Sequence, residues 1–205
     1  MEIGANRIRE IVKSLRNFSR LDEAEFKAVN MHEGIDSTLM ILQHRLKDQP
    51  KHPQIQVIKE YTMLPLVECY AGQINQVFLS ILTNAIDALE ETHQKSPKQP
   101  LTILIQTQRK SETDILITIA DNGTGIPESV KSKLFDPFFT TKPVGKGTGL
   151  GLSISYEIIT EKHQGKLWCE SSLGKGTKFF IQIPIQQDLP SEGKIKEARG
   201  RKESP

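Results

Sequence analysis

The stretch AGQINQVFLSILTNAIDALEE, from Ala71 to Glu91, decides the fold of this chain. Its apolar residues recur at helical spacing, which predicts a long helix with one broad apolar face packed on a core. This face comprises Ile74, Val77, Phe78, Ile81, Leu82, Ala85, Ile86 and Leu89. Asn84 interrupts the face, and a buried amide must be paired. Two explanations are open: a structural hydrogen bond, or an oxygen ligand for Mg²⁺, with Asp87 one turn further along the same side.

A second informative stretch is VGKGTGLGLS, from Val144 to Ser153, which leads into an apolar segment with helical spacing. Glycine occupies every second position of it, at Gly145, Gly147, Gly149 and Gly151. Glycines let the backbone approach a ligand closely, and the start of a helix presents unpaired N–H groups that attract phosphate. The pattern predicts a polyphosphate site or, alternatively, a flexible linker that ends at a helix.

Two further segments lie between this helix and the glycine run. Asp121 ends the strand-like DILITIAD and opens DNGTGI, where a carboxylate can accept a hydrogen bond from an exocyclic amine such as that of adenine. The same residues are also a strong turn signal. The next segment, LFDPFFTTKPVGKG, combines phenylalanines with hydroxyls and lysines. It predicts either a surface loop with a hydrophobic foot or a mobile lid whose lysines meet phosphates.

Composition limits the classes of protein that fit. The chain has 205 residues, of which 37% are hydrophobic and 25% are charged, enough for one domain with a core and a smaller appendage. A net charge of +2 does not favour nucleic acid or an anionic membrane as a partner. Cys69 and Cys169 lie far apart, which favours buried free thiols in a reducing cytosol. No apolar stretch approaches the roughly 20 residues that span a bilayer. We therefore expect a cytoplasmic protein with no membrane segment in this chain.

The chain divides into three parts. Residues 1–29 contain an apolar seam at Ile8, Ile11, Leu15 and Phe18, which predicts an amphipathic helix that packs on a partner helix or docks onto the following domain. Residues 30–187 mix helical segments with alternating strands and a hairpin, which predicts an α+β fold, a two-layer α/β sandwich, preceded by that amphipathic helix. Residues 188–205 are charged and aperiodic, which predicts a disordered tail.

Four motifs, in this order, resemble those of the ATP-binding catalytic domain of two-component sensor histidine kinases, within the GHKL ATPase group (the Bergerat fold). They are QVFLSILTNAIDA, DNGTGI, FDPFFTTK and GKGTGLGLS, and SLGKGT resembles the last glycine turn of the family. The resemblance covers about residues 31–185. It implies ATP and Mg²⁺ as cofactors and an acceptor histidine helix and a response regulator as partners. It also implies that residues 1–29 are the C-terminal part of a dimerisation helix, through which a homodimer would form.

The resemblance also implies the role of each matching position. Asn84 would be the Mg²⁺ ligand and, with Lys142, a catalytic residue, while Asp121 would contact the adenine amine. Gly123 and Gly125 would flank the base, and Gly145 to Gly151 would line the triphosphate. The full set implied for ATP binding is Asn84, Asp87, Asp121, Gly123, Gly125, Ile126, Phe135, Thr140, Thr141, Lys142, Lys146, Gly147, Thr148, Gly149, Leu150, Gly151 and Thr177.

Two positions depart from the family pattern. Ser80 stands one turn before Asn84, where ATP-hydrolysing relatives such as gyrase carry a glutamate that acts as a general base. The serine at this position argues against a hydrolytic ATPase. His32 is followed by Glu33 and then by Gly34, and it lacks the basic residue and the proline of the acceptor motif. We therefore expect His32 to be structural or exposed and the acceptor histidine to lie outside this chain.

The leading hypothesis is the ATP-binding catalytic domain of a sensor histidine kinase, which transfers the γ-phosphate of ATP to a histidine outside this chain. This chain alone would then lack its phosphoacceptor. The alternative is a nucleotide-binding dimerisation or regulatory module without transferase activity, because a complete set of ATP motifs fits both.

Overall fold

The computed structural model describes residues 26–49, 52–142 and 147–187. The predicted seam at 8–18 and the predicted tail at 188–205 lie outside these residues, as do Gly145 and Lys146. In the described part of the chain no helix is long and apolar enough to cross a membrane.

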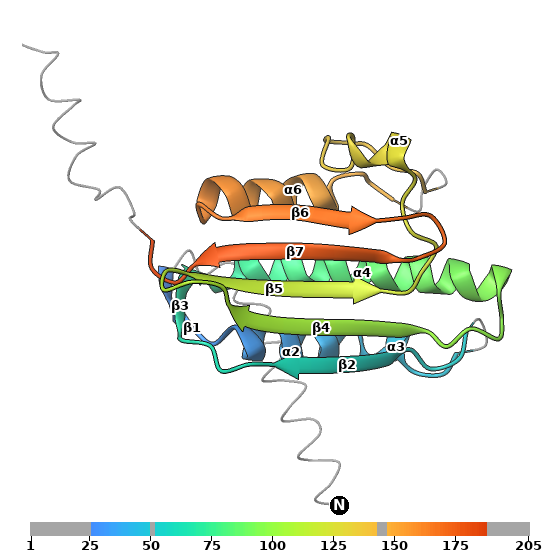
Figure 1. Ribbon diagram of the computed structural model, residues 1–205, viewed down its shortest axis with the longest axis horizontal. Coiled ribbons are helices and arrows are strands. Elements are labelled where there is room, and N and C mark those ends of the chain that lie inside the picture. Colours follow the sequence, from blue (N-terminus) through green and yellow to red (C-terminus); the bar gives the residue numbers. More distant parts are fainter. Residues whose placement is uncertain (1–25, 50–51, 143–146, 188–205) are drawn as a thin grey trace, which may run out of the picture.

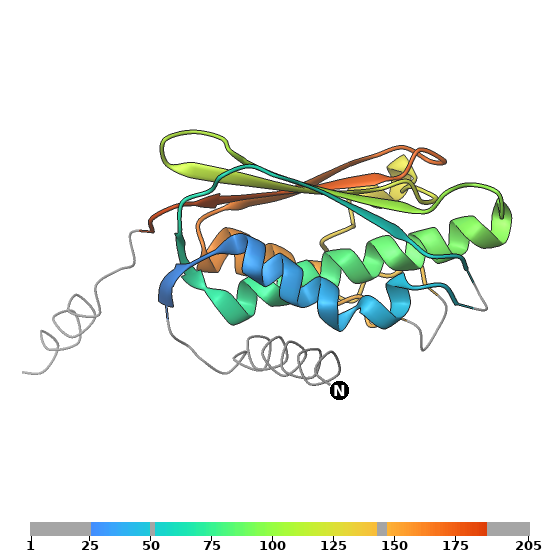
Figure 2. The same cartoon turned by 90° about the horizontal axis from the view of Figure 1, so that it is seen from below.

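The described residues form a five-stranded sheet with helices on one face, so the predicted two-layer α+β sandwich is confirmed (Figures 1 and 2). Strand β2 pairs with β4 in parallel, and all other neighbours in this sheet are antiparallel. In spatial order the strands are β2 (Gln56–Tyr61), β4 (Thr102–Arg109), β5 (Asp114–Asp121), β7 (Thr177–Pro184) and β6 (Lys166–Ser171).

The register of the three central strands, β4, β5 and β7, puts most of their isoleucines on the helical side. Ile105 lies opposite Ile119, and Ile119 lies opposite Phe179 in the next strand. Because side chains alternate along a strand, every second residue points to the same face. The inward residues of the three central strands are buried and make one layer of the core, namely Ile103, Ile105, Ile115, Ile117, Ile119, Phe179, Ile181 and Ile183.

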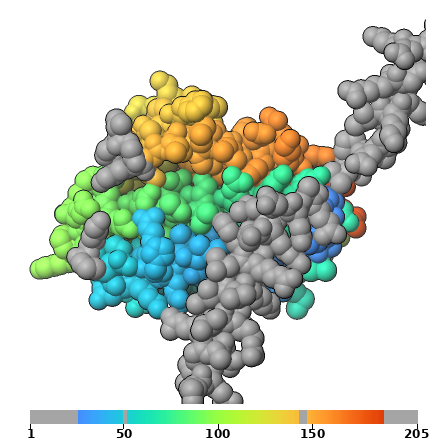
Figure 3. Space-filling model, turned by 180° about the vertical axis from the view of Figure 1, so that it is seen from behind, coloured from blue at the N-terminus to red at the C-terminus, as the bar shows by residue number. Residues whose placement is uncertain are grey.

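The other layer consists of helices. They are α2 (Met31–Ile41), the short α3 (Gln43–Leu46), α4 (Ala71–Lys95) and α6 (Gly151–Glu157), which continues into a π-turn, η2 (Ile158–Lys162). The single turn α5 (Glu128–Lys131) lies outside this layer, beside the β6 edge of the sheet (Figures 1 and 2). Figure 3 shows this side of the molecule, with α2 and α3, α4 and α6 next to one another. Helix α4 packs against both α2 and α6, so it is the central helix of the layer.

Helix α4 confirms the predicted apolar face, because all eight predicted residues are buried. The helix runs to Lys95, four residues beyond the predicted end at Glu91. It ends there because Ser96 precedes Pro97, and the residue before a proline is disfavoured in helical conformation. The apolar spacing of GIDSTLMILQHRLK, residues 34–47, predicts a single helix, but the segment forms two helices that are separated at Leu42. The sequence also predicts a short helix near Ser129–Phe135, where the structure has only the turn at Glu128–Lys131.

A small second sheet corrects the predicted boundary of the domain. Strand β1 (Phe26–Val29) pairs antiparallel with β3 (Val67–Tyr70), and the rings of Phe26 and Tyr70 lie 5.2 Å apart. The helical segment predicted from the sequence, residues 1–29, includes these four residues of β1. Their partner strand lies about forty residues away, so the pairing had no local signal.

Candidate functional site

Helix α4 brings two of the glycine motifs together along one line. A Cβ at Gly151, the first residue of α6, would lie 2.7 Å from the hydroxyl of Ser80. A Cβ at Gly123 would lie 2.8 Å from the Cβ of Ala88. These two contacts lie eight residues apart on α4, or about 12 Å along its axis. Gly123 has no room for a side chain, because its Cβ would also lie 3.0 Å from the backbone of Ala88, whereas at Gly151 the Ser80 hydroxyl would have to move.

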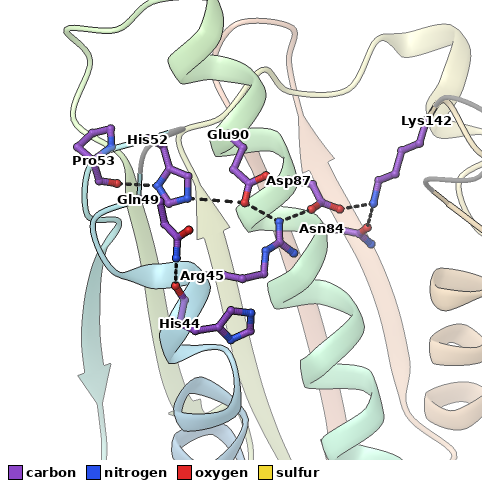
Figure 4. A network of polar contacts seen from close by, with 9 residues as sticks. All are labelled: His44, Arg45, Gln49, His52, Pro53, Asn84, Asp87, Glu90 and Lys142. Carbon is purple, nitrogen blue, oxygen red and sulfur yellow. Dashed lines mark hydrogen bonds and ion pairs between the residues drawn. The ribbon is translucent and has the colours of Figure 1, made fainter.

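Asn84 lies midway between these contacts and meets Lys142 (Figure 4). The Nζ of Lys142 donates to the Oδ1 of Asn84 at 3.0 Å and to the Oδ2 of Asp87 at 2.5 Å. The two acceptors come from one face of α4, and Lys142 is the last residue of the phenylalanine-rich motif FDPFFTTK, more than fifty residues later in the chain. The structure therefore brings together three of the residues that the sequence analysis assigned to the metal and phosphates.

Asp87 also has a partner on its other side. The Nη2 of Arg45 donates to the Oδ1 of Asp87 at 2.6 Å and to the Oε1 of Glu90 at 2.7 Å, and the Nε2 of His52 lies 3.7 Å from the same Glu90 oxygen (Figure 4). Burial lowers the pKa of the Arg45 guanidinium, but its hydrogen bonds and charge interactions with Asp87 and Glu90 outweigh this effect, and its pKa is raised. Arg45 thus holds the Asp87 carboxylate in place.

No sequence motif predicted a place in this site for Arg45, Glu90 or His52. Glu90 belongs to the predicted helix and lies one turn beyond Asp87, so helical spacing could have placed it beside Asp87. Arg45 lies forty-two residues before Asp87. No local spacing indicates that contact, which arises from the packing of α3 beside α4.

The oxygen atoms around Lys142 suit a hard cation. In the described ranges no group of three or more His, Cys, Asp or Glu side chains could hold a metal ion. A metal ion here would therefore depend on few protein ligands, as Mg²⁺ does when phosphates and water supply the rest. Asn84 and Asp87 contribute an amide and a carboxylate oxygen, and both already contact one cationic group, the ammonium of Lys142. The donor set fits Mg²⁺.

Asp121 ends β5 beside this helix. Its side chain is buried, with 9% of its surface exposed, and its Oδ1 accepts a hydrogen bond from the backbone N–H of Gly123 at 2.8 Å. Burial raises the pKa of this carboxyl to about 6, although the backbone N–H groups of Gly123 and Thr177 act to lower it. Desolvation of this kind is typical of functional sites. An ionised Asp121 can accept a hydrogen bond from an amine placed against it.

The loop after Asp121 is held against the turn between β6 and β7. Gly125 has φ +71°, and a Cβ there would lie 2.1 Å from the carbonyl oxygen of Ser172. The backbone N–H of Ile126 donates to the Oγ of Ser171 at 2.8 Å, and that Oγ lies 3.0 Å from the hydroxyl of Thr177. The predicted residues Gly125, Ile126 and Thr177 therefore form one connected group next to Asp121.

The phenylalanine-rich and glycine-rich motifs pack on each other. Gly149 has φ +68°, and a Cβ there would lie 2.4 Å from the carbonyl carbon of Phe138. A Cβ at Gly147 would lie 2.9 Å from the hydroxyl of Thr140. The ring of Phe135 lies 5.1 Å from that of Tyr156 on α6, which anchors the first motif. The described part of the glycine-rich run is therefore supported by the segment that carries Lys142.

The remaining predicted residues have less defined surroundings. The hydroxyl of Thr148 accepts a hydrogen bond from the backbone N–H of Leu150 at 3.3 Å, next to the start of α6. Thr141 is exposed. Lys146 lies outside the described residues, so its expected contact with phosphate stays a prediction.

His32 lies in a packed environment away from this site. Its ring stacks on Tyr61 of β2 with 4.2 Å between centroids, and its Nε2 lies 2.9 Å from the hydroxyl of Thr107. Burial lowers the pKa of His32. These contacts support a structural role for this histidine.

A groove of about 330 Å³ lies beside the start of α4, between that helix, β1 and α2. Its lining includes Met31, Leu66, Ile74, Asn75 and Phe78 but none of the residues assigned to ATP. The candidate nucleotide site lies on the other side of α4, where α6 and the glycine-rich run approach it.

The fold and the site together define a nucleotide-binding domain of the GHKL type. Its features are the two-layer α+β architecture, a buried aspartate at a strand end, an asparagine on the central helix, and glycine-rich backbone beside both. The chain belongs to the family described as histidine kinase-, DNA gyrase B-, and HSP90-like ATPase, whose model matches residues 70–187.

Individual relatives agree with this assignment. The sensor kinase CckA of Brucella abortus (strain 2308) is 34% identical over 186 residues, which cover 88% of this chain and 19% of that protein. The chain thus spans about a fifth of the length of that relative. Among solved structures, the nucleotide-free catalytic domain of the histidine kinase ThkA is 31% identical with a TM-score of 0.65, and the match covers 80% of this chain and 99% of that domain. A complex of ThkA with the response regulator protein TrrA matches with 27% identity and a TM-score of 0.62, over 90% of this chain and 49% of the ThkA chain.

Proposed function

We propose that this chain is the ATP-binding catalytic domain of a sensor histidine kinase and transfers the γ-phosphate of ATP to a histidine outside the described residues. The observation that carries the proposal is the arrangement along α4, where Gly151, the Asn84–Lys142 pair and Gly123 meet successive turns of one helix. A ligand extended along this line would have its anionic end near Lys142 and its base near Asp121.

Each residue has a distinct task in this proposal. Asp121 accepts a hydrogen bond from the adenine amine, and Gly123 and Gly125 let the backbone lie close to the base. Lys142 binds the phosphate oxygens. Asn84 supplies a neutral oxygen to Mg²⁺, which neutralises phosphate charge when it is bound.

The protein contributes positioning and charge rather than covalent chemistry. The γ-phosphate is held in line with an incoming imidazole nitrogen, which forms the new P–N bond as the bond to ADP breaks. Ser80 offers no carboxylate to activate water, which favours transfer over hydrolysis. The response regulator is proposed as the downstream partner on the basis of the ThkA complex. A cytoplasmic location and a homodimer formed through residues 1–29 belong to the same proposal.

A second candidate is a nucleotide-binding regulatory module without transferase activity. The packing of His32 on Tyr61 and Thr107 favours it for the isolated chain, because this histidine is not presented as an acceptor. Transfer of phosphate to an added histidine-bearing domain separates the two candidates.

The first experiment measures binding of Mg–ATP to the wild type and to Asn84→Ala. We expect Asn84→Ala to lose Mg²⁺-dependent binding, whereas Asn75→Ala, which removes an amide from the same helix, should bind as the wild type does. Equal affinity of wild type and Asn84→Ala would contradict the metal role.

The second experiment uses γ-labelled ATP with Mg²⁺ and the acceptor domain of a related sensor kinase. We expect acid-labile, base-stable label on the added domain and none on this chain. Label on this chain that disappears in His32→Gln would show that His32 is the acceptor. Nucleotide binding without any transfer would support the regulatory module.

A further inference from the structure

We propose that Lys142 is an internal competitor of the metal ion: its ammonium and a divalent cation exclude each other at Asn84 Oδ1 and Asp87 Oδ2. The consequence is that a metal ion binds well only when a nucleotide offers Lys142 another partner. This inference rests on the proposed function, because it concerns the regulation of the same site.

The exclusion follows from the distances. The Nζ of Lys142 lies 3.0 Å from the Oδ1 of Asn84 and 2.5 Å from the Oδ2 of Asp87. A Mg²⁺ ion would lie about 2.1 Å from the same oxygen atoms. Both cations would then be within a few ångströms of each other, where like charges repel strongly in a partly buried site. Only one cation can use these oxygens at a time.

Arg45 keeps the site in place during such an exchange. It binds the other oxygen of Asp87, Oδ1, at 2.6 Å, and also Glu90 at 2.7 Å. Asp87 is therefore held on one side when Lys142 leaves on the other. The Asp87 carboxylate stays oriented toward Asn84 whichever cation is present.

Charge balance then couples the metal to the nucleotide. Asp87 and Glu90 carry two negative charges, and Arg45 and Lys142 carry two positive charges, so the group is neutral. Without a nucleotide, a divalent cation must displace an ammonium that already has two good acceptors. With a polyphosphate present, the displaced ammonium gains phosphate oxygens and the added cation gains anionic ligands. Each ligand therefore strengthens the binding of the other, and the coupling is reciprocal.

The test is the binding of Mn²⁺ alone, followed by electron paramagnetic resonance of the free ion. We expect Lys142→Met to bind Mn²⁺ at least about tenfold more tightly than the wild type, while its affinity for ATP falls. Lys59→Met is the matched control, because the Nζ of Lys59 on β2 also pairs with a carboxylate, the Oδ1 of Asp36 on α2, at 2.7 Å. It should leave Mn²⁺ binding unchanged.

Adding Asn84→Ala to Lys142→Met should cancel the gain, which would locate the ion. Unchanged or weaker Mn²⁺ binding by Lys142→Met would overturn the proposal, and so would a gain that survives the loss of Asn84.

A measurement on the unaltered protein does not depend on the folding of any variant. Acetic anhydride labels lysine amines, and an amine held by two acceptors reacts slowly. Without nucleotide, and at a Mg²⁺ concentration high enough to displace Mn²⁺ from the protein, we expect Mg²⁺ to increase the labelling of Lys142, read by mass spectrometry, and to leave that of Lys59 unchanged. Equal labelling of Lys142 with and without Mg²⁺ would refute the competition.

These results are separable from the proposed function. A wild-type protein that fails to bind Mg–ATP would disprove the proposed function even if Lys142→Met gained affinity for Mn²⁺. Binding of Mg–ATP without that gain would disprove only the competition.

Discussion

Replacing Asp121 by asparagine should stabilise this protein at neutral pH and impair its binding of adenine. Burial raises the pKa of the Asp121 carboxyl from 3.8 to about 6, so the folded protein holds the ionised form at a cost. At about 1.4 kcal/mol for each pKa unit, this cost is about 3 kcal/mol at pH values above both pKa values. Asparagine is neutral and avoids the cost, and its Oδ1 can still accept the hydrogen bond from Gly123.

The sign of the pH dependence follows from proton binding. Between about pH 4 and pH 6 the folded protein binds a proton at Asp121 that the unfolded chain has released. The free energy of unfolding contributed by this group therefore falls as pH rises through that range. We expect Asp121→Asn to be more stable than the wild type by about 2 to 3 kcal/mol at pH 7.5 and to show no advantage at pH 4.

Urea unfolding at both pH values provides the assay, because the difference between variant and wild type cancels the titration of all other groups. Asp114→Asn is a control on the same strand. Hydrogen bonds from Thr113 and Gln182 lower the pKa of Asp114, so its pH dependence should have the opposite sign. A stability difference for Asp121→Asn that is the same at both pH values would refute the reasoning.

The same variant links stability to function. An amide both donates and accepts, whereas the ionised carboxylate only accepts. Binding of ADP should therefore fall more than binding of inorganic tripolyphosphate. A stability gain together with this selective loss would identify Asp121 as a residue whose burial is costly to the fold and is kept for ligand binding.

Two further predictions concern stability. Gly125→Ala should destabilise the protein by clearly more than Gly174→Ala in urea unfolding. Both glycines have positive φ, but a Cβ at 125 would lie 2.1 Å from the Ser172 carbonyl oxygen, whereas a Cβ at 174 would meet nothing within 4 Å. Equal losses of stability would show that only the backbone angle matters. His163 is fully buried, its Nδ1 lies 2.7 Å from the Ile158 carbonyl and its Nε2 accepts from the Tyr70 N–H, and burial lowers its pKa. The stability that His163 contributes should therefore fall as pH drops below 6.5, and the loss of about 1 to 3 kcal/mol caused by His163→Gln at neutral pH should shrink in acid; a loss that is independent of pH would contradict this.

Much of the fold was accessible from local patterns. The period of apolar residues from Ile74 to Leu89 predicted both α4 and the face that it buries, and the alternation in residues 166–185 predicted the hairpin of β6 and β7. Strand β1 was not predicted, because four residues such as Phe26–Val29 become a strand only beside a partner. The break at Leu42 was also missed, since the apolar spacing continues across it.

The sequence by itself determined which chemistry the chain carries: Asn84 and Asp87 on one helical face, Asp121 at the end of a strand, and glycines ahead of a helix. These are local properties, governed by helical period and by turn conformation. Only the tertiary structure decided that Lys142 and Arg45 bind the two oxygens of Asp87 from opposite sides. The reason is physical, because contacts between side chains more than forty residues apart depend on how α3, α4 and the loop before α6 pack, and no spacing along the chain records that packing.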